Sequence, residues 1–434
     1  MARINPMGTD RMLVKIGALT TIVALVATAA CRDITSLQQS NPGQLSASTV
    51  FIPANAPLIV NSAKGDFDCA YNEYIAGSGL FVDELQTAIS SLANQDYDRR
   101  SFTASGPFGT GSCISQQQPA VYTPLSVARA SNDTALAHLE GWTDAEVPNR
   151  SKLIGMASTY AGYSLVLLGE GMCSAALNNG PELTPAQLFA EAKARFDTAV
   201  VAATRAGDTK TLNLALLGRA RTQLDLGKPA AAAVDAALIP AGFEVDIDHD
   251  AVQTRRQNLV FIHTVQSAYS AVDTSIQNRY AASHDPRIAV TSLGKTGSNA
   301  ITVLVYPNKD ATATSPQAIA KYSEAQLIIA ENDVATGNLS GAVTIINALQ
   351  TAAGQPAFNP SPLNAPTVMA QIVEERKREF FLEGHRLGDL RRYNLPVMPI
   401  AGAPYPTGGT YAAQACFPLP DVERINNPNL NAKP

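Results

Sequence analysis

Small residues recur at one fixed spacing in two segments that lie far apart in the chain. In each segment an alanine is followed by a glycine seven positions later and by a second alanine twelve positions later. The positions are Ala220, Gly227 and Ala232 in one segment, and Ala330, Gly337 and Ala342 in the other. Gly162 and Gly169 repeat the first interval, and Leu, Ile and Val recur in phase around the triplets. Because Ala and Gly let two helices approach closely, this spacing predicts paired helices with a glycine at the turn.

This pattern is typical of tetratricopeptide-like helical hairpins, each of which buries its apolar side against a neighbouring hairpin. We expect such hairpins at about residues 152–240 and 316–352, with Thr184 as an N-cap and Pro185 at the first helical position of one helix. Coincidence in an alanine-rich chain is the alternative. The run AITVLVY at residues 300–306 predicts a short strand. The fold class is therefore mainly α, with a loop-rich, minor-β portion and a loop-rich C-terminal arm at residues 394–434.

The charge of the chain limits its partners. Only 16% of the residues are charged, against roughly 25% in an average soluble domain, and the formal net charge is −5. A nucleic-acid-binding surface needs clustered Lys and Arg, and no such cluster occurs in this sequence. We therefore expect no nucleic-acid partner.

The first residues have the pattern of an export signal. Arg3, Arg11 and Lys15 precede the apolar stretch IGALTTIVALVATAA, which is shorter than the ~20 residues of a membrane-spanning helix. Small residues continue to Cys31, as in a lipoprotein signal, although Thr28 occupies a position that usually carries Leu. We predict a signal peptide at residues 1–30, acylation of Cys31, a flexible tether at 31–60 and a single domain at 61–434. An ordinary secretory signal beside an incidental cysteine is the alternative.

Four further cysteines occur in the chain, Cys69, Cys113, Cys173 and Cys416. An even number of cysteines in an exported protein permits two disulfides, for which there are three pairings. The sequence does not choose among these pairings, and free buried thiols are the alternative. None of the spacings indicates a zinc site, and we expect no bound metal.

The segment EERKREFFLEGHRLGDLRRYN, residues 374–394, concentrates charge in a chain with little of it. On one helix spanning about 366–393, an apolar stripe would also include Arg376 and Glu383. Charges inside an apolar face are tolerated when paired, because an unpaired buried ion costs several kcal/mol. We predict a buried ionic seam with the pairs Arg376–Glu379 and Glu383–Arg386, each three residues apart. A pair of catalytic carboxylates is the alternative, but arginine neighbours would hold these acids ionised.

This segment resembles the signature helix of the SusD/RagB family of outer-membrane lipoproteins. The matching residues are Glu375, Arg376, Glu379, Glu383, Gly384, Arg386, Asp389, Leu390 and Arg392. The tail CFPLPDVERINNPNL is similar to the ending of the same family, at Pro418, Pro420, Glu423, Asn427, Pro428, Asn429 and Leu430. The order Asp83, Glu84 and Leu85 is similar to an early helix of the family. The resemblance implies a SusD-like fold for the mature chain.

The resemblance also implies a function. Members of the family are non-catalytic lipoproteins, lipid-anchored on the cell surface at the outer membrane of a Gram-negative-type envelope. They cap a SusC-like TonB-dependent β-barrel transporter and assist nutrient uptake. The implied ligand is an oligosaccharide, a peptide or another small polymer, bound by the loop-rich portion without a cofactor.

Aromatic side chains that could stack on a glycan are few, at 6% of the residues. We take Trp142, Tyr71, Tyr74 and Tyr306 as candidate ligand-binding residues, with core packing as the alternative role for each. A second hypothesis for the whole protein is a lipid-anchored tetratricopeptide-type adaptor that binds other proteins of the envelope. A hydrolase is disfavoured, because the sequence has no His-Glu-x-x-His spacing and no Gly-x-Ser-x-Gly elbow. We therefore expect no catalytic residues.

Overall fold

The computed structural model describes residues 46–113 and 116–430. The predicted signal peptide, the acylation site Cys31 and the tether up to residue 45 lie outside these residues. The chain divides into two compact units, Met1–Ile52 and Pro53–Pro434. In the first unit the structure describes one short helix, α2 (Ala47–Val50). Among the described residues, no helix combines the length and the apolar character that crossing a membrane requires.

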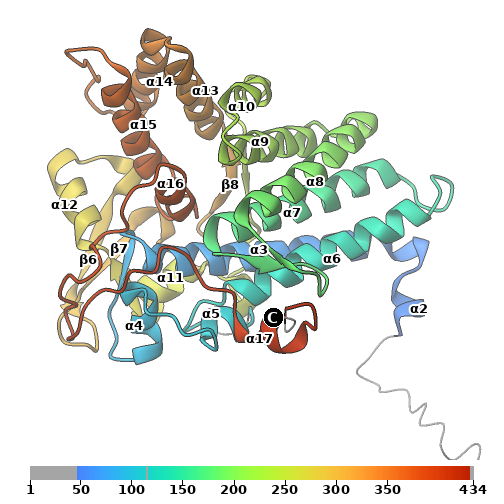
Figure 1. Cartoon of the computed structure of the whole chain (residues 1–434), viewed down its shortest axis with the longest axis horizontal. Helices are drawn as coiled ribbons and strands as arrows, with labels where there is room; N and C mark the ends of the chain where they lie inside the picture. Colours follow the sequence, from blue (N-terminus) through green and yellow to red (C-terminus); the bar gives the residue numbers. More distant parts are fainter. Residues whose placement is uncertain (1–45, 114–115, 431–434) are drawn as a thin grey trace, which may run out of the picture. The chain divides into compact units, whose positions relative to one another are not determined.

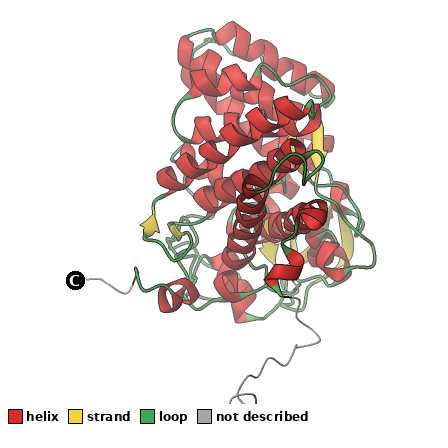
Figure 2. Cartoon of the chain, turned by 90° about the vertical axis from the view of Figure 1, so that its right-hand side faces the viewer, coloured by secondary structure: helices red, strands yellow, loops and turns green. Residues whose placement is uncertain are grey.

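The second unit is mainly helical, as predicted (Figures 1 and 2). Its first part is a set of six helices in which each helix packs against the next member of the set. These helices are α3 (Ala56–Phe81), α6 (Tyr122–Gly141), α7 (Arg150–Gly171), α8 (Pro185–Ala206), α9 (Thr209–Asp225) and α10 (Pro229–Ala236). The predicted start of α8 is confirmed, because the Thr184 hydroxyl accepts a hydrogen bond from the Gln187 backbone and Pro185 follows it.

The second predicted hairpin is formed by α13 (Tyr322–Thr336) and α14 (Leu339–Ala352). It packs against α10 on one side and against α15 (Ala365–Glu379) on the other. The predicted turn glycines are confirmed, since Gly227 and Gly337 have φ of 70° and 84° and end α9 and α13. The four alanines of the repeat are fully buried between helices. The small-residue spacing therefore marks real helix contacts.

Short antiparallel sheets and short helices make up the rest. The paired strands are β1 (Leu85–Thr87) with β5 (Ser270–Val272), β2 (Ala175–Ala176) with β3 (Glu182–Leu183), β4 (Glu244–Asp246) with β8 (Ala318–Lys321), and β6 (Val290–Thr296) with β7 (Val303–Pro307). The predicted strand at 300–306 corresponds to β7. The short helices are η1 (Pro53–Asn55), α4 (Leu92–Arg99), α5 (Pro107–Thr110), η2 (Thr254–Arg256), α11 (Leu259–Phe261), η3 (Ile262–Gln266), α12 (Thr274–Ser283), η4 (Pro286–Ile288), η5 (Asn308–Asp310), α16 (Arg386–Arg392) and α17 (Asp421–Asn426).

The charged segment at 366–393 is two helices and not the single helix that we predicted. α15 ends at Glu379 and α16 begins at Arg386. Between them Leu382 and Gly384 have φ of 53° and 71°, which a right-handed helix cannot accommodate. The turn sends three consecutive apolar side chains, Phe380–Leu382, into the core. A continuous helix would spread these side chains around its axis, so their joint burial favours the break.

The C-terminal arm is bound to the end of α7. Phe417 pairs with Met172 as an isolated parallel bridge, and its ring is fully buried among other aromatic rings of the core. Cys173 follows Met172 and Cys416 precedes Phe417, and a disulfide joins these two cysteines. A second disulfide joins Cys69 and Cys113. The structure thus selects one of the three pairings that the sequence left open. The Cys173–Cys416 disulfide attaches the arm covalently to the chain just after α7.

Candidate functional site

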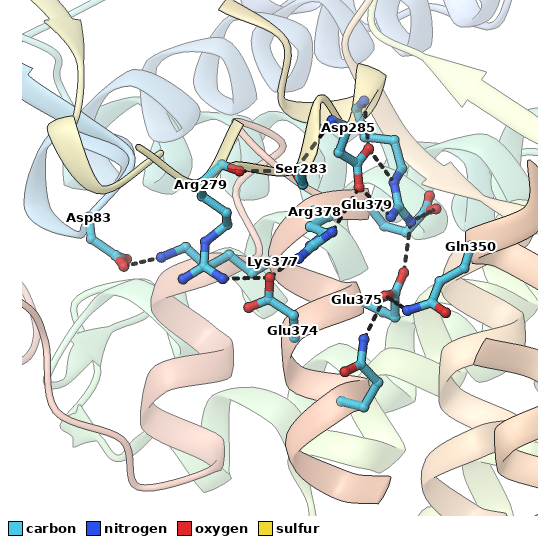
Figure 3. Close-up of polar contacts among 12 residues, drawn as sticks. Asp83, Arg279, Ser283, Asp285, Gln350, Glu374, Glu375, Lys377, Arg378 and Glu379 are labelled. Atoms are coloured by element: carbon cyan, nitrogen blue, oxygen red, sulfur yellow. Dashed lines mark hydrogen bonds and ion pairs between the residues drawn. The ribbon is translucent and has the colours of Figure 1, made fainter. Parts of the chain in front are cut away.

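The charged residues of α15, of α16 and of the turn between them contact partners from several other segments of the chain. We call these residues and their partners the ionic network, and Figure 3 shows the portion around α15. The partners come from the end of α3, from α12 and η4, from η5 and β8, and from α13. The predicted buried ionic seam is confirmed, because the signature residues Arg376 and Glu383 are only 4% and 6% exposed.

Arg376 of α15 binds across to α16. Its Nε lies 2.8 Å from Oδ2 of Asp389, and its Nη1 lies 3.7 Å from Oε1 of Glu331 on α13. Arg392 contacts the same two carboxylates. The predicted partner Glu379 is wrong, because the helix break brings α16 back alongside α15 and places Asp389 within reach. Two arginines and two acids thereby join α13, α15 and α16.

Glu375 and Glu379 share one cation from a distant segment. Nη1 of Arg287, in η4, lies 2.8 Å from a carboxylate oxygen of each. Asp285, fully buried at the start of η4, accepts from the same guanidinium at 2.6 Å and from Arg378 at 3.2 Å. This cluster fixes η4 against α15.

The turn between the helices is held by lysines. Glu383 pairs with Lys309 at 2.7 Å and with Lys321 at 2.9 Å, and not with Arg386 as we predicted. Arg386 instead pairs at 2.9 Å with Asp83, at the end of α3, which also binds Lys377. The predicted pairs were wrong because they assumed helical spacing across residues 380–385.

A further buried pair lies on the other side of α16. Arg221 of α9 donates to both carboxylate oxygens of Glu170 on α7, at 2.7 and 2.6 Å. The same guanidinium contacts the His385 ring at 3.2 Å. Burial, together with the charges of Arg221 and Arg376, holds the pKa of His385 well below its ordinary value. His385 is therefore neutral and positions α16 without adding a charge.

The electrostatics of the network determine what these acids can do. Burial by itself raises the pKa of Asp83, but Arg386 and Lys377 outweigh it and hold this pKa well below its ordinary value. The pKa values of Glu383 and Asp389 are lowered in the same way by their cation partners. Carboxylates held ionised in buried pairs cannot donate a proton, so Asp83, Glu383 and Asp389 cannot act as general acids. The network fixes the relative positions of the helices.

Two buried acids behave differently. Burial raises the pKa of Glu324 and of Glu84 to about 7. Glu84 accepts a hydrogen bond from the Leu382 backbone at 3.0 Å, so it ties α3 to the turn. Glu324 Oε1 has no hydrogen-bond partner within the described part of the chain. Both side chains are about 1% exposed, and a substrate cannot reach either of them.

The four aromatic candidates for ligand binding do not form one surface. Tyr71 and Tyr74 are 1% and 0% exposed, so for these two the alternative role, core packing, holds. The Tyr71 hydroxyl donates to backbone carbonyls of Ala318 and Glu383 at 2.7 Å each. Trp142 follows the end of α6 and stacks on His138, and Tyr306 lies on β7. The end of α6 and β7 lie on opposite sides of the molecule in Figure 1.

The residues of the family-like tail bind the β2–β3 hairpin. Asn427 Nδ2 donates to the Gly180 carbonyl at 2.8 Å, and Asn429 Nδ2 donates to the Asn179 carbonyl at 2.6 Å. Glu423 accepts from the Tyr122 hydroxyl at 3.0 Å. Pro420 packs so closely on Gly109 that a Cβ there would lie 2.3 Å away, and Leu430 packs against the main core. Pro418 is half-buried and Pro428 is exposed.

Sequence reasoning missed most of the partners in the ionic network. The cations and acids that it missed are Arg221, Arg287, Lys309, Lys321, Glu170 and Glu331. They come from six separate segments, and none stands in a charged motif. Asp83 was the one visible signal, because it was part of the family-like early helix.

Comparison with known proteins identifies the fold. A family model described as the SusD family matches residues 302–431. A solved SusD superfamily protein from Bacteroides vulgatus is 14% identical with a TM-score of 0.69, and the match covers 86% of this chain and 97% of that one. A SusD-like carbohydrate binding protein from the same species is 15% identical with a TM-score of 0.65, covering 87% and 97%. A SusD superfamily protein from Bacteroides thetaiotaomicron is 13% identical with a TM-score of 0.66, covering 87% and 98%. No curated protein matches the chain.

Proposed function

We propose that this protein is a cell-surface lipoprotein of the SusD/RagB family that serves nutrient uptake, because residues 302–431 match the SusD family model and most of the chain shares the fold of solved SusD superfamily proteins. It binds a glycan or another oligomeric nutrient and caps a SusC-like TonB-dependent transporter of the outer membrane. The family is one of non-catalytic binding proteins. The buried acids Asp83, Glu383 and Asp389 agree with this, because their cation partners lower their pKa values and keep them ionised inside the fold.

The observation that carries the glycan part of the proposal is the shared fold with a protein described as carbohydrate binding. Charge supports it as well, since a formal net charge of −5 and the absence of a basic cluster in the sequence disfavour polyanionic ligands. The lipid anchor is supported by the small residues before Cys31. With that anchor, the helical hairpins serve as the scaffold that meets the transporter, and the loop-rich portion carries the ligand.

The partner is tested by purifying the full chain from outer membranes in mild detergent. We expect one large β-barrel protein to co-purify with it. We also expect protease added to intact cells to cleave the chain, because it lies on the cell surface. Recovery of soluble periplasmic proteins instead, with protection from protease, would favour the adaptor hypothesis.

The anchor is tested by Cys31→Ser, with Ser36→Ala in the predicted tether as a control for a change near the acylation site. The first variant lacks the acylation site, and we expect it to be released into the soluble fraction when transporter genes are deleted. The second variant should stay with the membrane. Retention of Cys31→Ser in cells without the transporter would contradict the anchor.

A further inference from the structure

The start of α6, the β2–β3 hairpin and α17 surround a pocket of about 320 Å³. These three segments are distant in sequence, and the contacts of the family-like tail bring them together. Asn427 and Asn429 bind the hairpin carbonyls, and the disulfide Cys173–Cys416 joins the chain just before the hairpin to the C-terminal arm. The pocket is therefore held by covalent and hydrogen-bonded supports and does not depend on a flexible loop.

One wall of the pocket contains a buried arginine. Arg129 is 5% exposed, and its Nη1 donates to Asn178 Oδ1 at 2.8 Å and to Asp133 Oδ2 at 3.3 Å. Its Nε is buried and has no hydrogen-bond partner among residues 46–113 and 116–430. This Nε has almost no accessible surface, so a ligand in the pocket cannot reach it, and the role of Arg129 is to orient the Asn178 amide in the wall.

The opposite wall offers acceptors and amides. Glu423 receives hydrogen bonds from the Tyr122 hydroxyl at 3.0 Å and from Asn427 Nδ2 at 3.1 Å. The side chains of Asn179 and Asn426 are exposed at the rim, and amides both donate and accept. Val127 and Val422 add an apolar strip. Hydroxyls, amides and a short apolar surface thus face the same space.

The charge and size of the pocket restrict its ligand. The charged residues of the lining are Arg129 and Glu423, and both are already engaged. Arg129 pairs with Asp133 at 3.3 Å, and Glu423 accepts hydrogen bonds from Tyr122 and Asn427, so neither charge is free to bind an ion and a neutral ligand is favoured. About 320 Å³ is near the lower end of the 300–1,000 Å³ range of ligand pockets, which suits one or two ring-sized units. An extended peptide would need a longer groove or a free strand edge.

From this lining we propose that the pocket between α6, the β2–β3 hairpin and α17 binds one or two neutral sugar units of a glycan. The assignment rests on the proposed function and gives it a location. Each sugar hydroxyl donates and accepts one hydrogen bond, which matches the alternating amides, hydroxyls and carboxylate. The carbon face of the ring lies against Val127 and Val422. Tyr122 is buried, so it contributes its hydroxyl and not a stacking face.

The test uses the full chain in detergent and isothermal titration with maltohexaose, cellohexaose, xylohexaose and mannohexaose. One variant combines Asn179→Gly with Asn426→Ala, which removes both rim amides. Glycine suits Asn179 because its φ is 56°, and the backbone contact with Asn429 is kept. A second variant, Ala130→Arg, fills the pocket with a long side chain.

Two control variants carry the same kinds of substitution at exposed positions outside the pocket. Asn149→Gly alters another exposed asparagine with a φ of 60°, and Val234→Arg places an arginine on the exposed face of α10. We expect the pocket variants to weaken the best hexasaccharide at least tenfold and the controls to stay within twofold, with unchanged thermal unfolding.

The outcomes separate this inference from the proposed function. If the wild type binds a hexasaccharide and both pocket variants bind it within twofold, the pocket is not the site, although the proposed function stands. If the wild type binds none of the four hexasaccharides, the glycan part of the proposed function fails, and this inference fails with it.

Discussion

In the helical hairpins the helices touch through alanine and glycine, whereas around α15 and α16 they touch through paired ions. Gly162 on α7 and Gly218 on α9 both lie against the ring of Phe196 on α8, where a Cβ would come within 2.8 and 2.4 Å. Arg376 and Arg392 are instead held by Asp389 and Glu331. Small residues allow many related packings, but a buried ion accepts only the geometry that pairs it. The hairpins therefore set how closely helices pack, and the ionic network sets which segments meet.

The largest effect that separates the two regions is expected for Arg376→Ala. The change leaves Asp389 with one cation fewer inside the fold, and removing one partner of a buried pair costs about 3–5 kcal/mol. Chemical denaturation should show this loss in the free energy of unfolding. Arg205→Ala is the control, because Arg205 and Asp144 are 65% and 54% exposed and such a pair contributes about 0–1 kcal/mol. Equal losses of unfolding free energy for Arg376→Ala and Arg205→Ala would mean that a buried ion pair matters no more than an exposed one.

A smaller loss is expected from Gly218→Ala in the hairpins. The new Cβ would lie 2.4 Å from the Phe196 ring, and overpacking a core costs about 1–3 kcal/mol. Gly65→Ala is the matched control on α3, since no atom lies within 4 Å of its new Cβ. Helix propensity alone should make the control neutral or more stable by up to about 1 kcal/mol. A stabilised Gly218→Ala would show that the glycine contact is not close.

An effect of similar size, but one that is seen only as the pH rises, is expected from Glu324→Gln. Burial raises the pKa of Glu324 to about 7 in the folded protein, above its ordinary value of 4.5. The wild type therefore loses stability as the pH rises from about 4.5 to 7, because the folded state must then give up a proton that it binds tightly. The variant should nearly equal the wild type at pH 4.5 and exceed it by about 3 kcal/mol at pH 8, because one pKa unit corresponds to about 1.4 kcal/mol.

The control for this pH dependence is Glu191→Gln, whose carboxylate is half exposed and pairs weakly with Arg195 at 3.7 Å. The gain in stability of Glu324→Gln at pH 8 should exceed any change that Glu191→Gln causes, because only Glu324 is buried. If the difference in unfolding free energy between Glu324→Gln and the wild type did not change between pH 4.5 and 8, burial of Glu324 would not oppose its ionisation, which would contradict the prediction.

The two regions also differ in how far the sequence predicts them. The hairpin contacts repeat at a local spacing, so Gly227, Gly337 and the start of α8 at Thr184 could be predicted from neighbours in the chain. For the ionic network, the sequence predicted that Arg376 and Glu383 are buried and paired, but it did not predict which residues they pair with. Its partners, such as Arg287 for Glu379, lie in other segments, and helical spacing proposed the wrong neighbours.

Two other features depended on the tertiary structure. The break at Leu382 and Gly384 follows from burial of the turn in the core, and no proline or glycine run announces it. Four cysteines permit three pairings, and only the docking of the arm on α7 selects Cys173–Cys416. The pocket under the hairpin was missed for the same reason, because Arg129, Asn179 and Glu423 become neighbours only in the fold.

The most direct test of the ionic network is a double-mutant cycle between Arg376→Ala and Asp389→Ala. If the pair is buried and fixed as the structure has it, the coupling energy should be about 2 kcal/mol or more, and 1 M NaCl should change it little. A coupling below about 0.5 kcal/mol, or one that salt abolishes, would contradict the account that buried ions hold these helices together.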